Sequence, residues 1–242
     1  MVKVLTFLYR AVAIVLAGFY FIGLPVKIKG RPLGDKITVT AHAGCMELPM
    51  NSVEAMEAGV AAGADIVEFD LQYTADGTPV LSHDRPAEDA VCVTVAEAFA
   101  FLAAHPGVRA NVDVKSTEYL EKIPALAAEA GVTDRIFLTG LREHDIETAR
   151  EKCPGIPYYL NAGVSEDDDF AALAKKTARL GAIGVNLYWE DANPKLASVF
   201  HKAGLLVSVW TVDTVNIALF MALTGADNIT TNRPDLVSAL IR

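Results

Sequence analysis

A repeating alternation of strand-like and helix-like segments, running from residue 36 to the C-terminus, most constrains the fold. Each short apolar segment is followed by a longer stretch with apolar residues at helical spacing. Strands are expected at residues 36–44, 66–72, 110–116, 136–140, 158–162, 182–188, 205–212 and 228–232. Alternating strands and helices form parallel sheets through right-handed crossovers. Eight such units predict the α/β class and a closed (β/α)8 barrel, the TIM barrel.

An open, doubly wound sheet is the structural alternative. No Gly-x-Gly-x-x-Gly follows any expected strand, which disfavours the dinucleotide-binding form of that alternative. No Pro/Ser-rich linker interrupts the alternation, so residues 36–242 are expected to form one domain. The formal net charge of −9 argues against nucleic acid as a partner, because sequence-independent binding to the phosphate backbone needs a basic face.

The N-terminal segment is different in character. Residues Val4 to Val26 are apolar apart from Arg10 and a few small or hydroxyl residues, and Lys27, Lys29 and Arg31 follow them directly. This is long enough to cross a bilayer, which takes roughly 17–25 residues. We expect residues 1–30 to be a single-pass membrane anchor, and the positive charge after it predicts a cytoplasmic domain. A cleaved signal peptide, or a hydrophobic helix lying on the protein or in the membrane interface, remains the alternative.

The stretch from Ile66 to Asp84 places two acids on one face of a strand. Strand periodicity puts Glu68 and Asp70 on the same side, so together they can hold a cation. Asp76 and Gly77 then predict a turn, and the returning arm brings His83 back near the two carboxylates.

Polar residues recur at the expected carboxyl ends of the strands, where barrel sites gather. They are His42, Glu68, Asp70, Asp113, Lys115, Asn186, Tyr188 and Trp210. The three carboxylates form an oxygen-rich set that suits Mg²⁺ or Ca²⁺ better than Zn²⁺. Two histidines on separate strand ends can act as general acid and general base, and a lysine adds a fixed positive charge. Together these groups suit phosphoryl chemistry.

Seven motifs in order resemble the glycerophosphodiester phosphodiesterase family, whose pattern contains HRG, PENT, GADxIExD, DGxPVxxHD, xxExK, VWTVN and TDRP. This chain has HAG at 42–44, PMNS at 49–52, GADIVEFD at 63–70, DGTPV at 76–80 with HD at 83–84, VDVK at 112–115, VWTVD at 209–213 and TNRP at 231–234. The resemblance covers the chain from Val39 to its C-terminal end.

The resemblance implies a TIM barrel that hydrolyses a glycerophosphodiester or a lysophospholipid-type substrate with a divalent cation, Mg²⁺ or Ca²⁺. It implies the metal ligands Glu68, Asp70 and Asp113, and the acid/base pair His42 and His83. Lys115 would contact the phosphate and Trp210 would pack against the substrate. Asn186 is a further candidate for substrate binding, because it ends a strand at the same mouth.

Departures from the family pattern bear on the substrate. Ala43 replaces an arginine expected to touch phosphate, Met50 replaces a glutamate, and Asp113 is an aspartate in place of a glutamate. Arg85 or the basic residues after the anchor would be needed to supply the missing charge. Only about ten residues follow Asp84 before the next helix, so the usual inserted subdomain is short or absent. This open mouth beside a membrane anchor predicts a lipid-borne phosphodiester.

Two other functions stay open at this point. The first is a catalytically impaired, membrane-anchored barrel that binds a phosphorylated ligand or a protein partner, which Ala43 and Met50 favour. The second is a Schiff-base lyase that uses Lys115, although that chemistry leaves the three acids unexplained.

Overall fold

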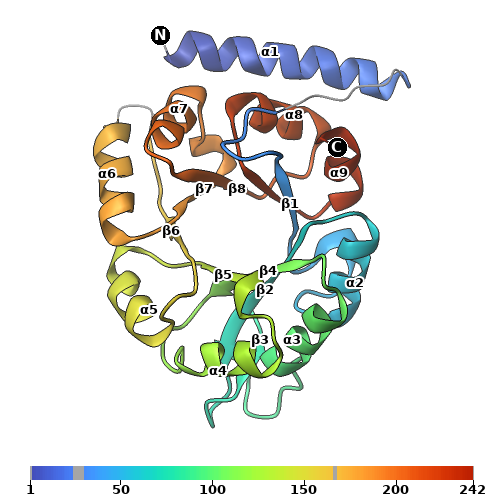
Figure 1. Cartoon of the computed structure of the whole chain (residues 1–242). Coiled ribbons are helices and arrows are strands. Elements are labelled where there is room, and N and C mark those ends of the chain that lie inside the picture. The colour runs from blue at the N-terminus through green and yellow to red at the C-terminus, as the bar shows by residue number, and fades with distance from the viewer. Residues whose placement is uncertain (1, 24–29, 166–167, 242) are drawn as a thin grey trace.

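The computed structural model of the chain describes residues 2–23, 30–165 and 168–241. Its parallel strands form a ring with helices outside it (Figure 1). They are β1 (Thr38–Ala41), β2 (Ile66–Tyr73), β4 (Arg109–Val114), β5 (Ile136–Thr139), β6 (Tyr159–Asn161), β7 (Gly184–Tyr188), β8 (Leu206–Trp210) and β9 (Asn228–Thr231). The helices are α1 (Val2–Phe21), α2 (Val53–Ala61), α3 (Val95–Ala104), α4 (Lys122–Glu129), α5 (Ile146–Lys152), α6 (Phe170–Leu180), α7 (Pro194–Lys202), α8 (Val215–Thr224) and α9 (Pro234–Ile241).

The strand order confirms the predicted TIM barrel. Neighbouring strands run β5-β4-β2-β1-β9-β8-β7-β6, so the first and last strands of the chain pair with each other. A parallel bridge between Leu138 and Tyr158 brings β6 back to β5 and completes the ring. An open doubly wound sheet is therefore wrong for this chain. Every expected strand is present, and each of its ends lies within three residues of the expected position.

The predicted hairpin after β2 is also present. Strand β3 (Pro79–Leu81) pairs antiparallel with β2, with Leu71 opposite Leu81. The Gly77 N–H donates to the Thr74 carbonyl at 3.0 Å, and Gly77 has a φ of 78°, which an L side chain rarely adopts. From the turn the chain runs back along β2 as far as Asp70, whose carbonyl accepts from the Ser82 N–H at 3.0 Å. Between β3 and α3, residues 82–94 contain no helix or strand beyond one bridge from Thr94 to Val80.

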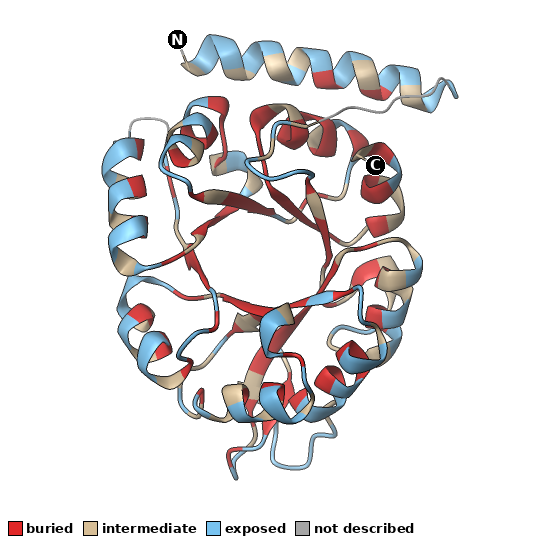
Figure 2. Cartoon of the chain, viewed as in Figure 1, coloured by how far each residue is buried: buried red, intermediate tan, exposed pale blue. Residues whose placement is uncertain are grey.

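The inner and outer faces of the barrel strands are both mostly buried (Figure 2). Apolar residues on their outer faces pack against the ring of helices and form two large clusters. Inside the ring, Ile66, Phe137 and Tyr159 pack together as an apolar plug. Because side chains alternate with a period of two, Glu68 follows Ile66 on the inner face and Thr139 follows Phe137. The polar residues are thus stacked above the plug, toward the carboxyl ends of the strands.

Helix α1 lies along the outside of the barrel, across α7 and α8 (Figure 1). Ala13 and Ala17 are its buried residues, whereas Phe7, Ile14 and many other apolar side chains are exposed. Within the described residues, α1 is the one helix long and apolar enough to cross a membrane by length and composition. The predicted boundaries of the anchor and the barrel stay predictions, and the basic residues at 27 and 29 lie outside the described residues.

Candidate active site

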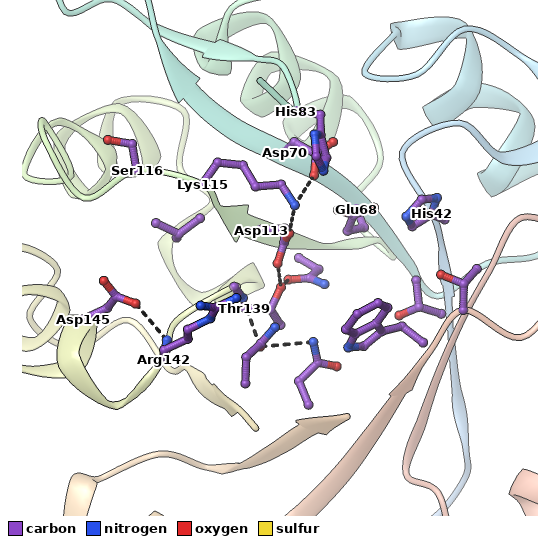
Figure 3. A pocket seen from close by; sticks show the side chains of 18 of the residues that line it. His42, Glu68, Asp70, His83, Asp113, Lys115, Ser116, Thr139, Arg142 and Asp145 are labelled. Carbon is purple, nitrogen blue, oxygen red and sulfur yellow. Dashed lines mark hydrogen bonds and ion pairs between the residues drawn. The ribbon is translucent and has the colours of Figure 1, made fainter. Parts of the chain in front are cut away.

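A cavity of about 620 Å³ opens at the carboxyl ends of the strands. All eight side chains assigned to catalysis, substrate binding or metal binding from the sequence line it (Figure 3). They are His42, Glu68, Asp70, His83, Asp113, Lys115, Asn186 and Trp210. The structure therefore brings together residues that are up to 168 positions apart in the chain, between His42 and Trp210. Their individual roles stay predictions.

The acidic residues of β2 and β4 converge because the two strands are in register. Asp70 pairs directly with Asp113, and Glu68 lies two residues earlier on the same face of β2. One carboxylate oxygen from each of the three residues lies within 4.8 Å of the others. Such a cluster can hold a divalent cation through oxygen ligands.

Burial and mutual repulsion shape the protonation of this cluster. Burial of Glu68 and the nearby charges of Asp70 and Asp113 raise the pKa of its carboxyl well above the usual range. The Ala43 N–H donates to Glu68 Oε2 at 2.7 Å and opposes this shift in part. A cation among the acids would relieve both effects, since it favours the charged carboxylate. The donor set therefore fits a hard divalent cation.

Lys115 is the positive partner of the cluster. Its Nζ lies 2.9 Å from Asp70 Oδ1 and also contacts Asp113 Oδ2. Burial alone would lower the pKa of the ammonium, but the charges and hydrogen bonds of Asp113 and Asp70 outweigh it and raise the pKa. A lysine that forms a Schiff base needs a lowered pKa, so this environment argues against the lyase alternative.

Asn51 is a site residue that the sequence analysis names only as part of the PMNS motif, without a role. Its Nδ2 donates to Asp70 Oδ2, and its Oδ1 accepts from the Asp70 N–H, both at 2.9 Å. Ser52 caps α2 instead, accepting from the Ala55 N–H. Asn51 adopts a φ of 61°, a conformation that asparagine tolerates better than most residues. The two-sided hydrogen bonding fixes one oxygen of Asp70.

The end of β5 supports Asp113. Thr139 Oγ1 lies 2.7 Å from both Asp113 Oδ1 and Asn111 Oδ1. Gly140 follows with a φ of 78°, and a Cβ there would lie 2.5 Å from the Val114 carbonyl oxygen. Its N–H donates to Asn161 Oδ1, which also accepts from Asn186 Nδ2. Asn161 therefore links buried Asn186 to the end of β5.

His42 is oriented by a pair of residues after β8 and β9. Asp213 accepts from the Asn232 N–H at 2.7 Å and from Asn232 Nδ2 at 2.9 Å. Since a carboxylate only accepts, the Asn232 amide oxygen must face His42, and it lies 2.9 Å from Nδ1. Neutral His42 therefore carries its proton on Nδ1, which leaves the Nε2 lone pair available.

His83 has a more open setting. It lies after β3, with 60% of its side-chain surface exposed, and its Nδ1 is 3.1 Å from Asp84 Oδ1. At the opposite rim, Trp210 packs edge-on against Tyr188, with ring centroids 5.7 Å apart. Both aromatic side chains are more than a third exposed and border the mouth.

The loop between β5 and α5 adds cavity residues that the sequence analysis did not select. Arg142, His144 and Asp145 line the cavity with the predicted residues. The strand-end rule could have found them, because they follow β5 directly. Arg85, one expected source of charge, is not among the lining residues and lies 3.7 Å from Glu118.

Comparison with known proteins supports the resemblance. The family model described as "Glycerophosphoryl diester phosphodiesterase family" matches residues 42–100 and 88–236. A glycerophosphodiester phosphodiesterase of Caldanaerobacter subterraneus is 22% identical, covering 86% of this chain and 98% of the relative. Lysophospholipase D GDPD3 of Mus musculus is 26% identical over 68% of this chain, which spans about half (49%) of that relative.

The fold has close counterparts among solved structures. A putative glycerophosphoryl diester phosphodiesterase from Silicibacter pomeroyi superposes with a TM-score of 0.73 at 20% identity, covering 87% of this chain and 97% of the other. The family model spans most of the barrel and all three acids. This chain therefore belongs to the glycerophosphoryl diester phosphodiesterase family of phosphoric diester hydrolases.

Proposed function

We propose that the chain is a divalent-metal-dependent phosphodiesterase that hydrolyses a glycerophosphodiester or a lysophospholipid-type substrate. The observation that carries the proposal is one cavity that holds three converging carboxylates, two histidines on separate loops and a lysine bound to two of the acids. Family membership supports the same reaction class.

Glu68, Asp70 and Asp113 would hold the cation, Mg²⁺ or Ca²⁺. When bound, the cation supplies charge stabilisation to the non-bridging phosphoryl oxygens. Lys115 keeps a positive charge beside the same acids and would contact the phosphate. Asn186 and Trp210 would contact the rest of the substrate from the other side of the cavity.

The histidines would move the protons. The free Nε2 of His42 suits a group that takes a proton from the attacking hydroxyl or water. His83, whose Nδ1 lies 3.1 Å from Asp84 Oδ1, would donate a proton to the leaving alkoxide. Each histidine borders the cavity that contains the acids, as the roles of general base and general acid require.

A lipid-borne substrate is favoured by the mouth of the cavity. Exposed Tyr188 and Trp210 form an apolar rim, and residues 82–94 form only a loop beside His83. The relative named lysophospholipase D is consistent with such a substrate. Hydrolysis rates for lysophosphatidylcholine micelles and for soluble glycerophosphocholine test this directly. Much faster cleavage of the soluble diester would refute the lipid assignment.

We further propose that α1 attaches the chain to a membrane. Its outer face exposes Val4, Phe7, Leu8, Ile14 and Val15, whereas its inner face packs against α8. Arg10, the charge in the middle of the helix, lies 5.2 Å from the centroid of the Phe220 ring. A helix held in this way favours attachment in the plane of the interface over a single-pass span. Cysteine accessibility from both sides of sealed vesicles separates the two modes.

The central experiment measures phosphodiester hydrolysis with and without a chelator. We expect activity to require the metal and to fall by about 10²-fold or more in His42→Ala and His83→Ala. His105→Ala is the matched control, because His105 lies at the end of α3 and does not line the cavity. Full activity in chelator, or in both site variants, would refute the mechanism. Tight metal binding with no hydrolysis of any phosphodiester would favour the binding-protein alternative.

A further inference from the structure

A phosphodiester brings a negative charge into a cavity whose centre is already acidic. Three carboxylates meet there, and Lys115 is bound to two of them. A second cationic side chain, besides Lys115, is therefore needed to attract the substrate and to hold its phosphoryl group.

Among the described residues, none of the positions that the sequence analysis suggested supplies this cation; Arg31 donates to the Tyr9 hydroxyl and does not line the cavity. Ala43 ends in a methyl group, is 3% exposed and takes part in the site through its backbone N–H. Arg85 does not line the cavity and faces Glu118. The basic residues at 27 and 29 lie outside the described residues.

Arg142 is placed to fill the role. It follows β5 by three residues, and its N–H donates to Asp145 Oδ2 at 2.9 Å, which anchors the loop. Its side chain extends toward Thr139 and the acids (Figure 3). The guanidinium has no hydrogen-bond or ion-pair partner among the described residues, whereas Lys115, the other lysine or arginine that lines the cavity, has two.

The geometry points to Arg142 as the phosphoryl-binding arginine of this cavity. A guanidinium can donate two parallel hydrogen bonds to the oxygens of a phosphate, which an ammonium cannot match in geometry. Binding from the β5 side would place Arg142 across the acids from β1, where the family pattern has its arginine. The assignment rests on the proposed function for the nature of the substrate, and it deepens that function by naming the anion contact.

Calorimetric titration with sn-glycerol 3-phosphate, in the presence of saturating Mg²⁺, tests the assignment without relying on turnover. We expect Arg142→Ala to weaken binding by about 10- to 100-fold. Arg142→Lys should fall between this variant and the wild type, because it retains a charge but loses the paired geometry. Arg85→Ala is the matched control, an exposed arginine outside the cavity, and should bind within about 2-fold of wild type.

Two results would overturn the assignment. The first is equal affinity of Arg142→Ala and Arg85→Ala for glycerol 3-phosphate. The second is a loss confined to intact phosphodiesters, because Arg142 would then contact the leaving group instead of the phosphoryl oxygens. If the wild type binds glycerol 3-phosphate but cleaves no phosphodiester, the proposed function fails while the role of Arg142 in binding stands.

Discussion

Replacing Asn232 with leucine tests how the fold prepares His42. The Asn232 side chain donates to Asp213 and accepts from His42 Nδ1, each at 2.9 Å. Leucine has a similar size and can do neither. Asp213 keeps the backbone N–H of residue 232 but loses one donor, and the proton on Nδ1 loses its acceptor.

The magnitude follows from these two hydrogen bonds. One involves a charged carboxylate and is worth about 1.5–3 kcal/mol, and the other is neutral and is worth about 0.5–1.5 kcal/mol. Because the groups are only partly buried, we expect Asn232→Leu to lower the free energy of unfolding by about 2 kcal/mol, near the lower limit of their sum. The effect on kcat should be larger, about 10²-fold or more, with little change in KM, because the imidazole would no longer present a fixed Nε2 lone pair.

Nitrogen-15 NMR of labelled histidines at about pH 9, where imidazoles are neutral, reads the tautomer directly. Wild-type His42 should carry its proton on Nδ1, and His42→Gln assigns its signals. His201 is an internal reference of the opposite kind, because its Nε2 lies 2.9 Å from the Asp227 carboxylate and must donate. The paired exchange of Asp213→Asn with Asn232→Asp keeps an acceptor beside His42 and should keep the Nδ1 proton. Wild-type His42 protonated on Nε2, or an unchanged tautomer in Asn232→Leu, would refute the reasoning.

Further expectations concern the metal cluster and its supports. Because burial raises the pKa of Glu68 in the folded, metal-free chain, ionising it on the way to neutral pH destabilises that state. Added Mg²⁺ should therefore raise Tm most at neutral pH, and progressively less as the pH falls through the raised pKa of Glu68. An equal increase in Tm at all pH values would contradict this, as would an undiminished increase in Glu68→Gln. Lys115→Met should lower the stability of the metal-free protein by about 2 kcal/mol, and less with Mg²⁺ present, as measured by urea unfolding. Gly140→Ala should lower the free energy of unfolding by about 2 kcal/mol and weaken Mg²⁺ affinity in titrations, because the added Cβ would clash with the Val114 carbonyl oxygen and lie 2.9 Å from Asp113 Oδ1. Unchanged Mg²⁺ affinity in this variant would show that Asp113 is insensitive to this strand end.

Much of the architecture could be predicted because it depends on local patterns. Strand-helix alternation gives the βα units, and the two-residue period of β2 places Glu68 and Asp70 on one face whatever surrounds them. Parallel strands joined by crossovers place strand ends at one mouth, so listing strand-end polar residues found seven of the residues that line the cavity. The hairpin that returns His83 was predicted from Asp76 and Gly77 for the same local reason.

Other features could not be predicted because they depend on contacts between distant segments. Asn51 and Ser52 are adjacent polar residues before α2, and only the approach of β2 assigns Asn51 to Asp70 while Ser52 caps the helix. The orientation of His42 requires Asn232 and Asp213, which come from the opposite end of the chain. The strand-end rule would place Arg142 near the mouth, but the direction of its side chain depends on the course of a loop with no periodic pattern.

The sequence by itself determined the barrel, its second-strand acids and the family, because side-chain alternation, turn residues and ordered motifs are local properties of the chain. The tertiary structure decided the protonation and the contacts of the site. The pKa of Glu68 depends on burial and on a carboxylate from β4, and the packing of Arg10 against α8 depends on how α1 lies on the barrel. These are properties of groups brought together through space, and no short segment of the chain contains them.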